Sequence, residues 1–373
     1  MISRGQDYEL NISRGLNLWD KALNLIPGGN MLLTKNKNLY SPELWPCYYS
    51  KVKGSKVWDL DGNKYVDFST NGVGACTLGH AHNEIDNAVI NSIKLGVMSS
   101  LNTPKEVELA EILVSLHPWA SMAKFARTGG EANSIAVRIA RAFTGKDKIA
   151  ICGYHGWHDW YLAANISDKD PLKDHLLEGL GSKGVPNNLA GTILPLRYNN
   201  FEDLQQLMSR NDIAAIKMEV VRSFNPDPRY LEKIREICDK KNIILIFDEC
   251  TSGFREAFGG IHMNFDISPD ICVLGKAIGN GYAITAVLGK RDVMSAACDS
   301  FISSTFWTES IGPTAACATL KEMKRIKSWQ TLPLIGLKVK NIWEKLAFEN
   351  NIPIKIFGIN AIPQFSFELE NSL

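Results

Sequence analysis

The chain has 373 residues, of which 45% are apolar and 22% are charged. This composition is typical of a globular protein with a large core and room for two domains, and it excludes a disordered chain. Lysine and arginine number 41 against 40 acidic residues, and a net charge of +1 gives no overall field that would recruit nucleic acid or an anionic membrane. The composition therefore favours a small-molecule partner.

Targeting signals and cysteine usage both favour a cytoplasmic protein. No stretch approaches the roughly 18 to 20 continuous apolar residues of a membrane span, and residues 1–7 carry charge where an export signal would have an apolar core. The eight cysteines form no Cys-x-x-Cys pair, and several lie inside apolar runs. Buried reduced thiols are therefore expected, in preference to disulfides or a zinc site.

The N-terminal part of the sequence predicts a helix and a β-hairpin. The helix covers residues 10–25 and ends at Pro27-Gly28-Gly29. Two strand-like runs, 57–60 and 64–68, are joined through Asp61-Gly62, which is a strong hairpin signal.

From residue 104 onward, helical and apolar strand-like segments alternate. We expect helices over 104–117, 130–144, 204–208, 228–240, 314–323 and 334–349, and strands over 123–126, 148–152, 214–221, 243–247, 271–274, 284–288, 353–357 and 364–368. This order predicts an α/β fold with a mostly parallel, doubly wound sheet, in which ligands bind beyond the carboxyl ends of the strands. We expect an N-terminal segment (1–75), a large domain (76–320) and a partial C-terminal small domain (321–373).

An acid and an amine follow two of these strands. Asp248 closes the apolar run Ile243–Phe247, and Lys276 follows the run Ile271–Leu274 after Gly275. Pyridoxal 5'-phosphate (PLP) needs this pair, because its aldehyde requires an amine for a Schiff base and its ring nitrogen requires a carboxylate to stay protonated. The alternative for Asp248 is a magnesium-binding acid in a nucleotide hydrolase, but the chain has no Gly-x-x-x-x-Gly-Lys-Ser/Thr loop.

Thr128-Gly129-Gly130 joins a strand to a helix, where free backbone amides and the positive end of the helix form a phosphate site. Taken alone, the motif is more often a plain glycine turn. It indicates a phosphate site only in the company of Asp248 and Lys276.

The segment Tyr154–Trp160 follows another strand and offers aromatic faces for a flat ring, with Tyr154 as the best stacking candidate. A metal site built from His155, His158 and Asp159 is a weaker alternative, because no further ligand cluster supports it. Glu219 follows the strand that precedes Asp248, and its position suits a surface charge and a pocket residue equally well.

Together these motifs resemble those of the class III, fold-type I PLP-dependent aminotransferases, and most of all the glutamate-1-semialdehyde 2,1-aminomutase branch. The resemblance extends from about residue 54 to residue 319. The matching segments are residues 57–67, 78–82, 128–132, 153–156, 246–255 and 275–281.

The resemblance implies a large domain with a smaller α+β domain formed by the N- and C-terminal segments. It implies PLP as the cofactor, with Lys276, Asp248 and Tyr154 catalytic, Cys250 on the second ring face, and no metal. Thr308 would reach the phosphate of a neighbouring subunit, so a homodimer with shared active sites is expected. The implied cofactor-binding residues are Thr128, Gly129, Gly130, Tyr154, His155, Glu219, Asp248, Cys250, Lys276 and Thr308.

The chain departs from the family pattern at several positions. Arg127-Thr-Gly-Gly replaces the more common Asn-Ser-Gly-Thr, which removes one hydroxyl donor and adds a charge at the phosphate turn. Glu219-Val220 replaces Glu-Pro, and residues 157–161 make the lid more aromatic. Relatives also continue beyond the point where this chain stops, so we expect a shortened C-terminal domain.

The predicted function is transfer of an amino group from a small-molecule donor to an oxo or aldehyde acceptor through a Schiff base at Lys276. The aromatic lid favours an acceptor with a broad hydroxylated or apolar face, such as a sugar-derived carbonyl. The alternative is a glutamate-1-semialdehyde 2,1-aminomutase, which moves the amine within one molecule to give 5-aminolevulinate. A non-catalytic binding protein on the same fold is a third hypothesis, although a degenerate site should first lose its lysine.

Overall fold

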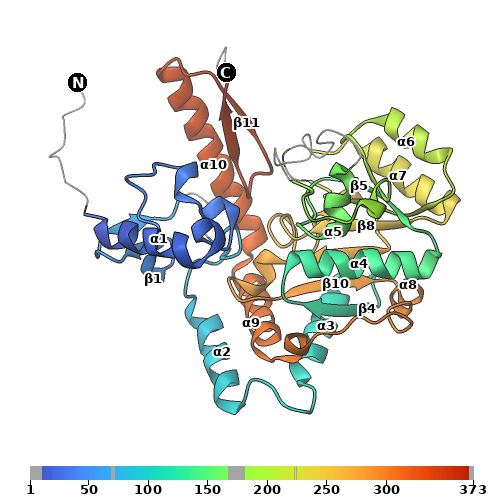
Figure 1. Cartoon of the computed structure of the whole chain (residues 1–373), viewed down its shortest axis with the longest axis horizontal. Helices are drawn as coiled ribbons and strands as arrows, with labels where there is room; N and C mark the ends of the chain where they lie inside the picture. Colours follow the sequence, from blue (N-terminus) through green and yellow to red (C-terminus); the bar gives the residue numbers. More distant parts are fainter. Residues whose placement is uncertain (1–10, 69–71, 167–180, 222, 224, 369–373) are drawn as a thin grey trace. The chain divides into compact units, whose positions relative to one another are not determined.

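The computed structural model describes residues 11–68, 72–166, 181–221, 223 and 225–368. The chain divides into two compact units, Met1–Asn83 and Glu84–Leu373 (Figure 1). The three-part division expected at residues 75 and 320 stays a prediction.

The N-terminal unit contains a helix and a small antiparallel sheet. Helix α1 (Ser13–Leu25) precedes the strands β1 (Tyr49–Lys53), β2 (Lys56–Asp59) and β3 (Lys64–Val66), which pair in that order. The buried Asp59 carboxylate accepts hydrogen bonds from the backbone N–H groups of Asp61 and Asn63 at 2.9 and 2.8 Å. These bonds close the turn at Gly62, whose φ of 92° favours glycine, and the predicted hairpin is confirmed.

The second unit is built on a seven-stranded sheet with the order β4-β10-β9-β8-β7-β5-β6. The four pairs from β9 to β6 are parallel, whereas β10 runs antiparallel to both β9 and β4. The mostly parallel α/β sheet predicted from the sequence is therefore confirmed. The strands are β4 (Met122–Ala126), β5 (Lys148–Cys152), β6 (Ile193–Pro195), β7 (Ile213–Met218), β8 (Ile244–Glu249), β9 (Ile271–Leu274) and β10 (Thr285–Gly289).

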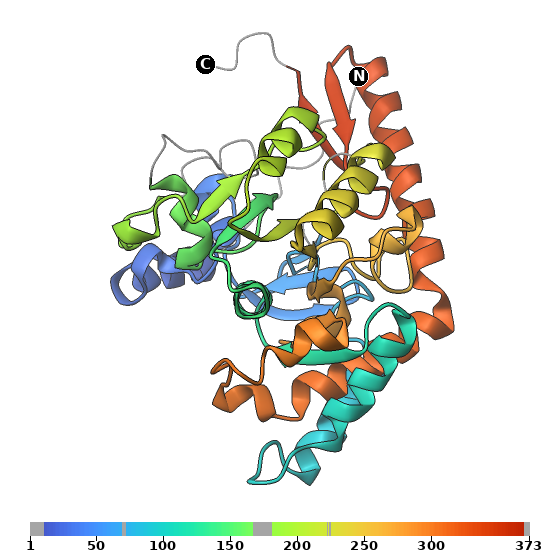
Figure 2. The same ribbon diagram turned by 90° about the vertical axis from the view of Figure 1, so that its right-hand side faces the viewer.

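Helices cover both faces of this sheet. Helix α4 (Gly129–Thr144) crosses one face and contacts the strands from β4 to β7 in the sheet order, and Figure 2 views it along its axis. Its buried stripe includes Ala132, Ala136 and Ala140, whose small side chains allow close contact with the sheet. Helix α7 (Pro228–Lys241) packs against β7 and β8, and it buries residues of a second apolar cluster that includes Phe247.

The other helices and the C-terminal hairpin complete this unit. They are α2 (Asn83–Leu95), α3 (Pro104–Leu116), α5 (Asp159–Leu162), α6 (Phe201–Met208), α8 (Arg291–Ser295), α9 (Ile311–Ile326), α10 (Ser328–Glu349), β11 (Ile354–Phe357) and β12 (Gln364–Phe367).

The differences from the predictions include two helix starts and one strand. Helix α10 begins at Ser328 and includes Pro333, which we expected to lie before the helix. Helix α6 begins three residues earlier than expected, because the Asn200 side chain caps it by accepting the Asp203 N–H bond. Strand β6 was not predicted, since it has only three residues and ends in proline.

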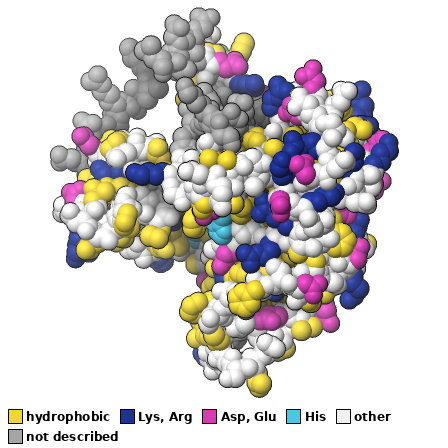
Figure 3. Space-filling model, turned by 45° about the vertical axis from the view of Figure 1, so that its right-hand side comes forward, with side chains coloured by type: hydrophobic (Ala, Val, Ile, Leu, Met, Phe, Trp, Pro, Cys, Tyr) yellow, Lys and Arg dark blue, Asp and Glu magenta, His cyan; other side chains and the backbone are white. Residues whose placement is uncertain are grey.

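The surface carries mixed charge. Basic and acidic side chains alternate over the face shown in Figure 3, in keeping with the net charge of +1. Among the described residues, no helix combines the length and apolar character needed to cross a membrane.

Gly336 allows α10 to touch the loop before β12. A Cβ atom at this position would lie 1.6 Å from the backbone oxygen of Asn360. Alanine stabilises a helix interior by about 1 kcal/mol relative to glycine. The overlap with Asn360 outweighs this gain, so Gly336→Ala should lower the free energy of unfolding by about 1–3 kcal/mol through overpacking. Urea denaturation measures this change. Lys338→Ala, on an exposed part of the same helix, should stay within about 0.5 kcal/mol, and an equally stable Gly336→Ala variant would contradict the predicted contact.

Candidate active site

The carboxyl ends of β8 and β9 bring an acid and an amine together. The two strands are parallel neighbours, with Asp248 opposite Val273. Lys276 follows β9 at the start of a 3-10 helix, where its φ is 42°, and its Nζ donates a hydrogen bond to Thr251 Oγ1 at 2.7 Å. The structure thus places Asp248 and Lys276 at one edge of the sheet, as the strand pattern predicted.

Asp248 is a buried carboxylate, with 3% of its surface exposed. Its Oδ2 accepts a hydrogen bond from His155 Nδ1 at 2.8 Å, and its Oδ1 accepts one from the Cys250 backbone N–H at 3.1 Å. Burial alone would raise the pKa of this carboxyl, but Lys217 and the His155 hydrogen bond outweigh burial and hold the pKa well below its usual range. The carboxylate is therefore charged at neutral pH.

Lys217 is a member of this site that sequence reasoning missed. It lies on β7 opposite Ile246 of β8, so it shares a sheet face with Asp248. The side chain is fully buried, its Nζ lies 3.7 Å from Asp248 Oδ2, and it makes no hydrogen bond within the described residues. Burial lowers the pKa of the amine, and Asp248 opposes that effect. The signal was visible in the sequence as a single lysine inside the apolar strand 213–218.

The phosphate turn is a helix N-terminus with a capping box. The Thr128 side chain accepts the Glu131 N–H bond, and Glu131 Oε2 accepts bonds from the N–H and the hydroxyl of Thr128. The Thr128 hydroxyl is therefore committed to the helix cap. The N–H groups of Gly129 and Gly130 belong to the first turn of α4 and have no partner among the described residues.

Two glycines let the phosphate turn and the strand edge approach Cys250. A Cβ atom on Gly129 would lie 3.5 Å from Cys250 Sγ, and one on Gly275 would lie 3.2 Å from the same sulfur. The phosphate turn and the segment before Lys276 thus both lie against the Cys250 side chain. Larger side chains at either glycine would crowd it.

Arg127 points away from the phosphate turn. Its Nε lies 2.7 Å from Glu309 Oε1, and its Nη2 donates to the carbonyl oxygens of Trp307 and Glu309, each at 3.0 Å. The extra charge noted in the sequence is therefore neutralised by Glu309. These contacts anchor the 3-10 helix Thr305–Thr308, on which Thr308 is exposed.

Glu219 positions the aromatic segment that follows β5. It is 5% exposed, so it is not a surface charge, and its Oε2 accepts the Tyr154 N–H bond at 3.0 Å. The Tyr154 ring meets Tyr161 edge to face, with centroids 5.9 Å apart. The loop held by Glu219 also carries His155, the hydrogen-bond donor to Asp248.

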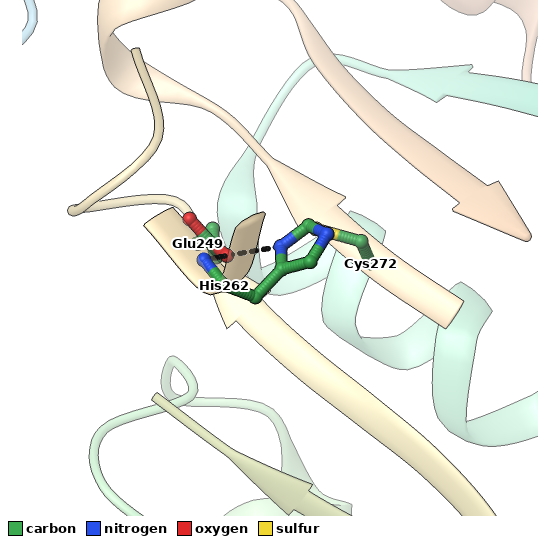
Figure 4. A group of neighbouring side chains, drawn as sticks. All are labelled: Glu249, His262 and Cys272. Atoms are coloured by element: carbon green, nitrogen blue, oxygen red, sulfur yellow. Dashed lines mark hydrogen bonds and ion pairs between the residues drawn. The ribbon is translucent and has the colours of Figure 1, made fainter. Parts of the chain in front are cut away.

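A second buried cluster, formed by Glu249, His262 and Cys272, has the ligand types of a metal site (Figure 4). His262 Nδ1 donates to Glu249 Oε1 at 2.6 Å, however, and His262 Nε2 accepts the Trp119 indole N–H at 2.9 Å. Burial raises the pKa of the Cys272 thiol well above its ordinary value, which keeps it protonated. The cluster is therefore a hydrogen-bond network. It joins Glu249 at the end of β8 to the 3-10 helix Ile261–Phe265, which carries His262.

Comparison with known proteins identifies the family. The model of the family described as "Aminotransferase class-III" matches residues 40–352. The chain belongs to the class III aminotransferases. It is 34% identical to a 3-aminobutyryl-CoA aminotransferase of Cloacimonas acidaminovorans over 98% of this chain and 86% of that protein. It is also 34% identical to a glutamate-1-semialdehyde 2,1-aminomutase of Nitrosopumilus maritimus over 91% of this chain and 80% of the relative.

A solved structure supports the same family. The FumI protein of Sphingopyxis sp. MTA144, described in its PLP internal aldimine form, superposes with a TM-score of 0.85 at 27% identity. The match covers 95% of this chain and 83% of that one. Class III aminotransferases depend on PLP, so PLP is the cofactor of this enzyme and the fold is fold-type I.

The residues of the site fit this cofactor. Two N–H groups in the first turn of α4 suit its phosphate, and Cys250, which lies against Gly129 and Gly275, stands next to that turn. A buried, charged carboxylate at Asp248 suits a protonated ring nitrogen.

The Lys217–Asp248 ion pair predicts a coupled pair of substitutions. Asp248→Asn leaves the Lys217 charge buried without a counter-charge, and it should lower the unfolding free energy of the cofactor-free protein by about 3–5 kcal/mol. Adding Lys217→Met removes that charge and should recover most of the loss, as urea denaturation would show.

The exposed pair Lys345–Glu349 provides a matched control, because its charged atoms are also 3.7 Å apart. Glu349→Gln should change the unfolding free energy by less than about 0.5 kcal/mol. Failure of Lys217→Met to rescue Asp248→Asn would show that the buried pair is not coupled.

Proposed function

We propose that this aminotransferase moves an amino group between an amino donor and an oxo or aldehyde acceptor, with Lys276 as the amine that binds PLP. The observation that carries the proposal is the meeting of Lys276 and the charged Asp248 at the ends of adjacent parallel strands. PLP supplies an aldehyde that forms a Schiff base with an amine, and a ring that accepts the electron pair released at the substrate carbon.

Contacts support the proposed roles of Asp248 and Lys276. Asp248, kept ionised by Lys217 and His155, holds a proton at the ring nitrogen. The Thr251 hydroxyl orients Lys276 Nζ, and with the cofactor bound the lysine would accept and return a proton at the substrate carbon. As the family resemblance implies, Tyr154 would cover one face of the ring and Cys250 would line the other.

Phosphate binding and subunit contacts complete the proposal. We assign the phosphate to the turn Thr128-Gly129-Gly130, where the backbone N–H groups donate and the Thr128 hydroxyl fixes the cap. Glu219 and His155 line the pocket from the β7 and β5 sides. Thr308 is proposed to contact the phosphate of a second subunit, which makes the protein a homodimer with shared sites. Its proposed location is the cytoplasm.

The substrate assignment rests on the relatives. The name of the Cloacimonas relative makes 3-aminobutyryl-CoA a candidate amino donor. The second candidate function is the aminomutase, which the name of the Nitrosopumilus relative favours. Relatives with both names are 34% identical to this chain, so the choice between the two functions is left to the donor assay.

Lys276→Ala should abolish the visible absorption band that appears when PLP is added to the cofactor-free protein, because no amine remains at that point of the site. Activity should fall by at least about 10³-fold, as expected for loss of a covalent group. Spectrophotometric titration and a coupled donor assay measure both effects. Lys290→Ala, a lysine paired with Asp270, is the control and should keep the band.

The same assay separates the two candidate functions. An aminotransferase requires a separate donor, so 3-aminobutyryl-CoA or glutamate should bleach the band and release an oxo product. Conversion of glutamate 1-semialdehyde to 5-aminolevulinate without a donor would instead establish the aminomutase.

Mixed dimers test the shared site. Lys276→Ala and Thr308→Ala homodimers should both have low activity. A mixed dimer has one intact site, with Lys276 from one subunit and Thr308 from the other. Activity of differently tagged, co-purified mixtures should therefore exceed that of either parent several-fold, and a mixture with no gain would rule out Thr308 as a residue shared between subunits.

A further inference from the structure

His158 lies against the first turn of α4. A Cβ atom built on Gly130 would be 2.8 Å from His158 Nε2 and 3.0 Å from its Cδ2. The imidazole therefore occupies the place that a side chain at position 130 would take. Glycine at this position permits the approach, and the ring nitrogen ends against the first turn of α4.

Two contacts of Ser134 bear on the proton of this imidazole. The Trp160 indole N–H donates to Ser134 Oγ at 3.0 Å, and Ser134 Oγ lies 2.6 Å from His158 Nδ1. In the tautomer in which the serine hydroxyl donates to Nδ1, the neutral imidazole carries its hydrogen on Nε2, which is then a donor.

His158 Nε2 has no hydrogen-bond partner among the described residues. The hydroxyl donors that related sequences more often carry at positions 128 and 130 are not available to a phosphate in this chain. The Thr128 hydroxyl is bound to Glu131, and position 130 has no side chain. The imidazole N–H in this tautomer is therefore a third donor next to the two backbone N–H groups of the first turn.

We propose that His158 is a phosphate-binding residue of the cofactor site, donating from Nε2 and replacing a hydroxyl at position 130. The proposal deepens the proposed function and rests on PLP lying at the Gly129-Gly130 turn. Ser134 and Trp160 serve as positioning residues, because they hold the imidazole in the donating tautomer.

The experiment compares PLP with pyridoxal, which lacks the phosphate, in titrations of the cofactor-stripped full chain followed by absorbance and tryptophan fluorescence. A hydrogen bond to a charged group makes His158→Ala weaken PLP binding by roughly 10- to 100-fold. Pyridoxal binding should change by less than about threefold. Asp159→Asn alters the adjacent exposed acid without touching the Ser134–His158 contact, and it should not weaken PLP binding.

A reciprocal substitution keeps the test independent of simple misfolding. In the natural chain Gly130→Ser would crowd His158 and weaken PLP binding, whereas in His158→Ala the new hydroxyl has both space and a phosphate to bind. The double variant should therefore bind PLP at least about fivefold more tightly than His158→Ala alone.

The outcomes separate the two proposals. Equal losses for PLP and pyridoxal, or no loss for PLP, would overturn the role of His158 while leaving the cofactor site intact. If the unchanged chain itself gave no Lys276-dependent band with PLP, the proposed function would fail, and the role of His158 would fail with it.

Discussion

The buried negative charge of Asp248 is the constraint around which the site is organised. A carboxylate removed from water is costly unless charges and hydrogen bonds replace its hydration. Here the compensation comes from three directions: the His155 imidazole, the Cys250 backbone N–H and the Lys217 ammonium. Each partner belongs to a different segment, so the ionised acid requires β5, β7 and β8 to be correctly paired.

This dependence links the fold directly to the chemistry. Parallel pairing aligns the carboxyl ends of β7, β8 and β9, and the face shared by Lys217 and Asp248 is the one that α4 covers. The positive end of α4 therefore begins beside the acid. The site needs no dedicated loop to bring phosphate donors, acid and amine together.

The strand pattern predicted the parts of the site that depend on sheet topology. Asp248 and Lys276 could be placed at one edge because each follows an apolar run, and Thr128-Gly129-Gly130 could be placed between a strand and a helix. Lys217 and His158 could not be assigned from pattern alone. The role of Lys217 depends on register across two strands, and that of His158 depends on the space left by a glycine 28 positions earlier. Both roles depend on distances between residues that are far apart in the sequence, and the spacing of apolar residues does not predict such distances.

The ion pair between Arg127 and Glu309 has a consequence beyond neutralising a charge. It joins the residue that precedes the phosphate turn to the segment that carries Thr308, so the two cannot shift independently. In a dimer where Thr308 serves the opposite site, a phosphate bound at one turn would also affect the position of the Thr308 segment that serves the other subunit. Under the proposed shared site, the segment that carries Thr308 is thus tied to the phosphate turn of its own subunit while its threonine serves the other.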